Sequence, residues 1–139
     1  MVLLVLTTQS HTVEAKNKHL YNNTSHKYLS RIIEHEAGHV KKHTAYMVGV
    51  VVLKRVKSPL FPDTVKDVLL QDGPRQYMSD YEFSQVTPSK RSKKLSKKLL
   101  KGGFKGVSKY PDNLLYHANF KQGSVYDYSD GVYFCLHNS

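Results

Sequence analysis

A glutamate between two histidines stands at a spacing that proteins use for metal chemistry. The stretch reads His35-Glu36-Ala37-Gly38-His39 and matches the zinc-protease pattern H-E-x-x-H. On one helix the two histidines would lie one turn apart and could bind the same zinc ion, while the glutamate would activate the metal-bound water. The other interpretation is that the glutamate works as a general acid without any metal. So short a motif does not decide between the two.

Three observations argue against zinc. A catalytic zinc needs a third protein ligand, and the candidates His43, Glu82 and His117 stand at no spacing known from zinc proteases. Gly38 weakens the helix that would hold both motif histidines in register. The chain also contains eight histidines, so a chance match to the motif is not negligible. We therefore expect no metal and no cofactor, and keep a zinc metallopeptidase with the two motif histidines as ligands as the alternative.

Length and charge limit the other functions. The chain has 139 residues, 40% of them hydrophobic, which suits one globular domain. Its single cysteine, Cys135, excludes an internal disulfide and a cysteine-based zinc site. The net charge of +10 favours polyanionic partners such as nucleic acid, an anionic membrane or an anionic cell wall. A lysine-rich segment at residues 89–103 carries leucines at helical spacing, so one face of this helix is basic and either solvated or in contact with an anion.

The beginning of the chain is expected to form an arm. Its apolar run, MVLLVL, is too short for a signal peptide or a membrane span, and no basic segment precedes it. We expect a buried edge strand or an ordered arm there. Residues 10–26 are polar and show no periodicity, which predicts an arm or a loop. If the protein acts outside the cytoplasm, another route must deliver it.

Periodicity predicts a mainly helical domain. The second predicted helix is apolar nearly all round and should be the central one; its valines would also suit a strand, but a Thr44 cap and the basic ending at Lys54 and Arg55 favour a helix. We expect residues 71–88 to form a loop, and two aromatic, β-branched runs to form a strand pair. The fold class is therefore α+β, a helical body with a small antiparallel sheet. The predicted helices are 25–38, 44–56, 63–70 capped by Asp63, and 89–103 capped by Ser89 and stopped by Gly102-Gly103, and the predicted strands are 113–120 and 131–137.

A longer stretch of the chain resembles a known family. It reads EHEAGHVKKHTAYMVGVVVLKRVKSPLFPDTVKDVLLQDGPRQYMS, in which RVKSPLFPDTV is the most specific part. It resembles the catalytic core of the SleB/CwlJ-type cell wall hydrolases, the spore cortex-lytic enzymes and their bacterial and phage relatives. That family reads roughly E-A-x-G-E, then G-Q-x-A-V-A-x-V-V-L-N-R-V, then S-x-x-F-P-x-T-V-x-x-V-I-x-Q, then G-Q-F-S-P-V. The similarity covers about residues 30–136. The chain departs from the pattern at Val40, Thr44-Ala45, Lys54 and Val132.

The resemblance implies a fold and a reaction. It implies a mostly helical, lysozyme-like or lytic-transglycosylase-like single domain at residues 27–139, preceded by an N-terminal arm at residues 1–26. The family cleaves peptidoglycan glycan strands between muramic acid and glucosamine, in several members as lytic transglycosylases. That reaction needs one carboxyl, which would be Glu36 as general acid and then base with a raised pKa. Ordinary hydrolysis uses two carboxylates, and Glu34 and Asp80 are the nearest candidates for the second.

The resemblance also implies the residues that bind the glycan. Gln76 and Tyr77 match the family's Q-F pair, and Tyr116 and His117 lie on the strand that resembles its Y-Y-x-N element. Ser79 is a further candidate for the groove. The partners would be peptidoglycan glycan strands, with no nucleic acid and no membrane insertion, and the protein would be a monomer. A catalytically degenerate domain that binds the wall or another polyanion is a further alternative.

The place of action follows from the same family. The protein would act at the cell wall or the spore cortex. Without a signal peptide, it would be phage-encoded and delivered by a holin or in the virion, or assembled into spores.

Overall fold

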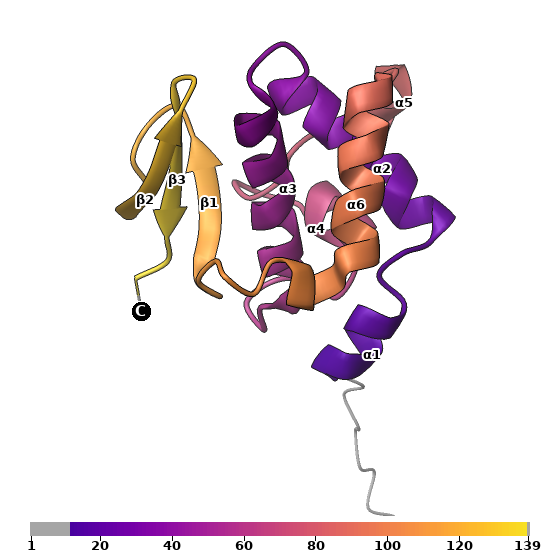
Figure 1. Cartoon of the computed structure of the whole chain (residues 1–139), viewed down its shortest axis with the longest axis horizontal. Helices are drawn as coiled ribbons and strands as arrows, with labels where there is room; N and C mark the ends of the chain where they lie inside the picture. The colour runs from indigo at the N-terminus through magenta and orange to yellow at the C-terminus, as the bar shows by residue number, and fades with distance from the viewer. Residues whose placement is uncertain (1–11, 139) are drawn as a thin grey trace, which may run out of the picture.

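The most apolar segment of the chain forms the centre of the molecule. A computed structural model describes residues 12–138, and the expected strand or arm at the apolar N-terminal run lies outside these residues. Helix α3 lies between the small sheet and the other helices and contacts α2, α4, α6 and β1 (Figure 1). The helices are α1 (Val13–Lys18), α2 (Asn23–Ala37), α3 (Lys42–Lys57), α4 (Val65–Leu70), α5 (Asp80–Gln85) and α6 (Lys90–Gly106), and the strands are β1 (Leu114–Ala118), β2 (Ser124–Ser129) and β3 (Val132–Leu136).

The predicted central helix is confirmed as a helix, but its first residue differs from the expected one. Most side chains of α3 are buried, which agrees with a segment that is apolar on every side. Helix α3 begins after Lys41, without a side-chain cap, so the expected Thr44 cap is wrong. Instead, the Thr44 hydroxyl donates to the Asp130 carboxylate at 2.6 Å and lies 2.6 Å from the Ser129 hydroxyl. These bonds connect the first turn of α3 to the hairpin between β2 and β3.

The lysine-rich helix follows its sequence pattern closely. Ser89 caps α6 by accepting from the Ser92 amide, as predicted. The leucines of α6 are buried against α2 and α3, and its lysines face outward. The predicted stop is confirmed in part, because Gly103 takes a φ of 63° and interrupts the helix before one further turn. The Phe104 amide donates a hydrogen bond of 2.8 Å to Asn17 Oδ1, which connects this kink to α1.

Three short elements differ from the prediction. Thr64 rather than Asp63 caps α4, because its hydroxyl accepts from a first-turn amide, whereas Asp63 forms an ion pair of 2.8 Å with Lys16. The predicted loop at residues 71–88 contains α5, which begins with a reciprocal capping box. The predicted arm or loop at residues 10–26 contains α1 and the start of α2 where the structure describes it. The division of the chain into an arm and a domain at residue 27 remains a prediction.

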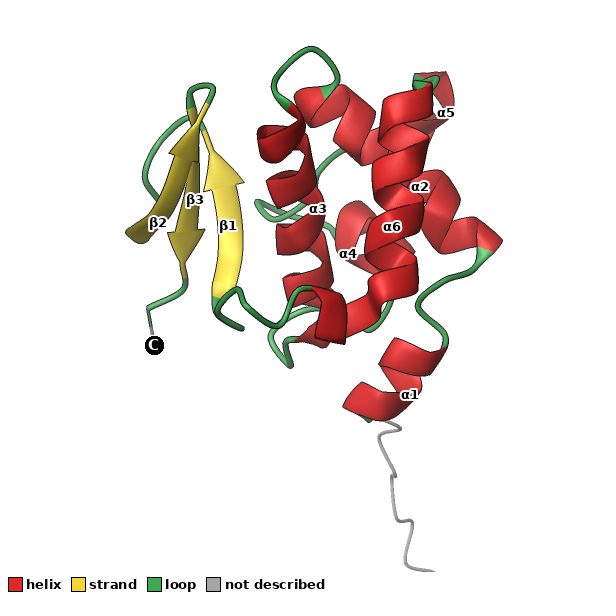
Figure 2. Cartoon of the chain, in the orientation of Figure 1, coloured by secondary structure: helices red, strands yellow, loops and turns green. Residues whose placement is uncertain are grey.

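The sheet contains the predicted strand pair and one additional strand. Strands β1 and β3 pair antiparallel as predicted, and β2 pairs with β3 on the other side, giving the order β1-β3-β2. The sequence interpretation missed β2. Its turn to β3 runs through Asp130 and Gly131, both with positive φ (51° and 80°), which is typical of a two-residue hairpin. Figure 2 shows this sheet beside a larger helical part, which confirms the α+β class.

Close packing of α3 against α6 gives a test of the core. A Cβ atom added to Gly49 would overlap the Leu99 side chain of α6, which is itself buried. We expect Gly49→Ala to lower the free energy of unfolding by about 1–3 kcal/mol in urea denaturation. Gly102→Ala is the control, because a Cβ there meets nothing within 4 Å, and it should be neutral or stabilising by up to about 1 kcal/mol. Equal stability of the two variants would contradict this packing.

Candidate active site

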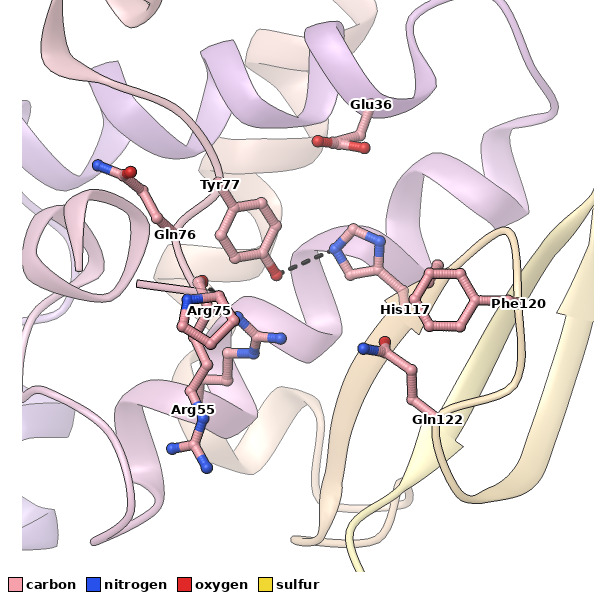
Figure 3. Close-up of a pocket in the computed structure, with 10 residues that line it drawn as sticks. Glu36, Arg55, Arg75, Gln76, Tyr77, His117, Phe120 and Gln122 are labelled. Carbon is pink, nitrogen blue, oxygen red and sulfur yellow. Dashed lines mark hydrogen bonds between the residues drawn. The ribbon is translucent and has the colours of Figure 1, made fainter. Parts of the chain in front are cut away.

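A hollow of about 240 Å³ opens between the end of α2, the loop before α5 and the end of β1. Each of these segments supplies side chains to its wall. Figure 3 shows the Glu36 side chain on α2 directed toward Tyr77 from the loop and His117 from β1. The full lining is Glu36, Arg55, Pro74, Arg75, Gln76, Tyr77, His117, Ala118, Phe120 and Gln122.

Glu36 is accessible to solvent, but its carboxyl is partly desolvated by the surrounding protein. It lies on the last turn of α2, and as a whole residue it remains exposed, so a substrate can reach it. Burial among nearby protein atoms nevertheless raises the pKa of Glu36, and the charge of His35 opposes this shift only in part. The exposure describes the whole residue, whereas the pKa responds to the density of protein around the carboxyl, so the two observations are compatible. The sequence predicted a raised pKa, and its direction is confirmed.

Tyr77 and His117 form a neutral pair in the wall. The Tyr77 hydroxyl lies 3.0 Å from His117 Nε2, and the two rings lie 5.3 Å apart between centroids. Burial, assisted by the charge of Arg55, lowers the pKa of His117 to about 3. Burial also raises the pKa of Tyr77. At neutral pH both rings are therefore uncharged, and they can still donate and accept hydrogen bonds.

Arg55 holds two walls of the hollow together. This side chain of α3 is only 6% exposed. Its Nε donates to the Leu115 carbonyl on β1 at 2.7 Å, and one terminal nitrogen donates to the Arg75 carbonyl in the loop at 3.3 Å. Its guanidinium also lies over the Tyr77 ring, 5.0 Å from the centroid. Sequence reasoning treated Arg55 only as part of the basic end of a helix, where Lys54 and Lys57 also lie, so the sequence did not single it out.

The structure gathers four of the six predicted site residues around this hollow: Glu36, Gln76, Tyr77 and His117. Ser79 lies outside the lining and caps α5. Tyr116 lines an adjoining hollow instead, and its hydroxyl lies 2.7 Å from His137 Nδ1. The aromatic Phe120 and the amide of Gln122 also belong to the lining, and sequence reasoning did not single them out.

Neither candidate for a second carboxylate lines the hollow. Glu34 accepts hydrogen bonds from the Ser92 and Ser89 hydroxyls, and these bonds lower the pKa of Glu34. Asp80 accepts a hydrogen bond of 2.5 Å from the Tyr28 hydroxyl. Glu36 is therefore the only carboxylate among the described residues of the lining.

The two motif histidines do not share a helix. Helix α2 ends at Ala37, so His39 lies beyond it, in the turn that follows Gly38. Both His35 and His39 are exposed. Within residues 12–138, no three histidine, cysteine, aspartate or glutamate side chains form a group that could hold a metal ion. The arrangement thus lacks the helical register that the zinc-protease motif needs.

A comparison with protein families decides the class of the protein. The family model described as cell wall hydrolase matches residues 38–133, more than half of the chain. The chain belongs to the cell wall hydrolase family. As a family member it is a hydrolase that acts on peptidoglycan, which confirms the resemblance seen in the sequence. The matched region contains Gln76, Tyr77 and His117, and it begins two residues after Glu36.

Other comparisons add no relative. Neither the curated proteins nor the solved structures compared with the chain give a significant match. Among the helices of residues 12–138, none is both long enough and apolar enough to cross a membrane.

The neutral state of His117 has a measurable effect on stability. Below pH 6.5 the unfolded chain protonates this histidine, while the folded chain does not do so until about pH 3. The unfolded state therefore binds more protons, and we expect His117 to make the unfolding free energy fall as the pH drops from about 6.5 toward about 3. Denaturation of His117→Gln over this range should show a weaker pH dependence than the wild type. The exposed His19→Gln is the control, and an equal slope in wild type and His117→Gln would contradict a neutral, buried His117.

Proposed function

We propose that this cell wall hydrolase cleaves the glycan bond between muramic acid and glucosamine as a lytic transglycosylase, with Glu36 as its general acid and base. The observation that carries the proposal is the single carboxylate in the lining of the hollow, with its raised pKa. A second carboxylate would be needed to activate water in ordinary hydrolysis. In a lytic transglycosylase a hydroxyl group of the substrate attacks in place of water, so no second carboxylate is needed.

The reaction balances with this one residue. Protonated Glu36 donates its proton to the glycosidic oxygen as the bond to the muramic anomeric carbon breaks. The C6 hydroxyl of the same muramic residue then attacks that carbon, and the Glu36 carboxylate accepts the hydroxyl proton. The products are a free glucosamine 4-hydroxyl and a 1,6-anhydromuramic end. Glu36 returns to its protonated state, and no water is consumed.

The other lining residues suit a sugar. Phe120 is 58% exposed and offers an apolar ring face on which a pyranose can stack. Gln76 and Gln122 provide amide donors and acceptors, and the neutral Tyr77–His117 pair provides a hydroxyl and a ring nitrogen. Because neither ring of the pair is charged, the pair itself does not lower the pKa of Glu36, as the acid role requires.

Three of the departures from the family pattern, at Val40, Lys54 and Val132, lie outside the lining of the hollow. Lys54 is buried and bonds Asp112 at 3.0 Å, so its charge has a partner elsewhere in the fold. Val40 and Val132 are half-buried and pack against the core. None of these three lines the hollow, which favours an active enzyme over a degenerate binding domain.

The basic face of α6 suits a substrate that carries negative charge. Its exposed lysines suit an anionic wall or spore cortex, to which they would draw the enzyme by long-range attraction. Delivery from a phage, by a holin or in the virion, or assembly into spores remains part of the proposal.

Product analysis tests the reaction. We expect mass spectrometry of muropeptides released by the wild type to show anhydromuramic ends, and Glu36→Gln to reduce their formation by about 10²–10⁴-fold, because the amide cannot donate the proton. Glu34→Gln is the matched control, since its carboxylate bonds serines outside the hollow. It should retain activity.

Other products would give other answers. Reducing muramic ends would mean hydrolysis and would require a second carboxylate. Cleaved stem peptides with intact glycan, lost on chelation, would instead support the zinc peptidase. No product from intact protein would mean a binding domain.

The pH profile provides an independent check. Because Glu36 must be protonated to act as the acid, kcat/KM should fall as the pH rises through its pKa. Burial raises the pKa of Glu36, so this fall should come at a higher pH than the ordinary glutamate value of about 4.3. A fall centred at or below about 4.3 would contradict the role of Glu36.

A further inference from the structure

The buried positive charge of Arg55 has no carboxylate partner in the part of the chain that the structure describes. Two of its nitrogens donate to backbone carbonyls, and the ion pairs found among residues 12–138 do not include it. The second terminal nitrogen has no acceptor among these residues, yet it is not sealed from solvent. Buried cations are ordinarily paired, so an unpaired one at the wall of a hollow points to an anionic ligand.

Arg75 places a second guanidinium at the same wall. It is half-buried, and one of its nitrogens donates to the Leu60 carbonyl at 3.3 Å. Both arginines lie against the Phe61 ring, at 4.8 Å for Arg55 and 4.7 Å for Arg75. Aromatic rings compensate the charge of a cation only in part. Two like charges held against one ring therefore leave a local excess of positive charge.

The two arginines lie where the hollow with Glu36 continues into a second one. This second hollow has a volume of about 390 Å³ and shares Arg55, Pro74, Arg75 and Gln122 with the first. Its remaining lining is Tyr116, His137 and Asn138, all without negative charge. A ligand in the second hollow would thus meet the arginines while an adjoining part of the same molecule reaches Glu36.

We propose that Arg55 and Arg75 form a carboxylate-binding subsite that recognises the acidic substituent of a muramyl unit. A guanidinium presents paired N–H donors that match a carboxylate, and partial burial strengthens such bonds. In peptidoglycan that carboxylate belongs either to the lactyl group or to the stem peptide attached to it. The subsite would position the muramic residue so that its glycosidic bond lies at Glu36. This inference rests on the proposed glycosidase function and adds what the enzyme recognises.

Binding experiments in the Glu36→Gln background separate recognition from cleavage. Three probes are compared by calorimetry: a chitin tetrasaccharide without carboxylates, a peptide-free glucosamine–muramic tetrasaccharide with lactyl carboxylates, and the same tetrasaccharide carrying stem peptides. Arg75→Gln removes one cation of the subsite. It keeps both backbone carbonyls to which Arg55 donates, because the substitution changes only a side chain. Lys18→Gln is the matched control, because it removes one positive charge from an exposed residue of α1.

We expect Arg75→Gln to weaken binding of a carboxylate-bearing probe by about tenfold, as for loss of one charge-assisted hydrogen bond, and to leave the chitin probe within about twofold. Arg75→Lys should restore part of the loss, since it keeps the charge without the paired donors. Lys18→Gln should bind all probes like the parent. The probe that responds identifies the lactyl or the stem-peptide carboxylate as the ligand.

Several results would overturn the subsite. One is equal affinity of the parent for all three probes. Another is a loss of affinity in Arg75→Gln that is as large for the chitin probe as for the carboxylate-bearing probes. A third is that no probe binds. Failure of the glycosidase proposal would appear separately, in the wild-type products. A wild type that releases anhydromuramic ends but binds chitin and muramyl probes alike would keep the reaction and reject the subsite.

Discussion

The site depends on one buried arginine that bonds two backbone segments far apart in sequence. Arg55 projects from the central helix and donates to carbonyls of β1 and of the loop before α5. Removing the side chain would leave both carbonyls without their donor and would free the two walls that carry His117 and Tyr77. Burial, assisted by the charge of the same cation, lowers the pKa of His117 and keeps that ring uncharged. One side chain thereby connects two walls of the hollow and helps to keep the His117 ring uncharged.

The long, strongly periodic helices were predictable from the sequence, whereas three of the short elements, α1, α5 and β2, were not. Helices α2, α3 and α6 bury many apolar residues that recur at helical spacing, so the prediction of a helix there does not depend on any single residue. Helix α5 depends on a reciprocal cap within six residues, and β2 pairs with β3 through a two-residue turn. Such local chemistry competes with tertiary contacts, as Thr44 shows by bonding the hairpin instead of capping its own helix.

The candidate site was predicted in its chemistry but not in its assembly. The resemblance placed Glu36, Gln76, Tyr77 and His117 together, and the hollow brings them together. The importance of Arg55 was not predictable, because its burial depends on rings supplied by Phe61 and Tyr77 from other segments. A charge in an apolar helix is visible in the sequence, but its partners are visible only in the fold.

The bonds between the hairpin and the central helix have a consequence for binding. Thr44 and Lys41 bond Asp130, and His43 Nε2 lies 2.7 Å from Asp127, so the end of the sheet is fastened to the start of α3. Arg55 fastens β1 farther along the same helix. A wall held at both ends has little freedom left to lose when peptidoglycan binds. The enzyme is thus preorganised, and ordering of the protein should cost little of the affinity for its polymer.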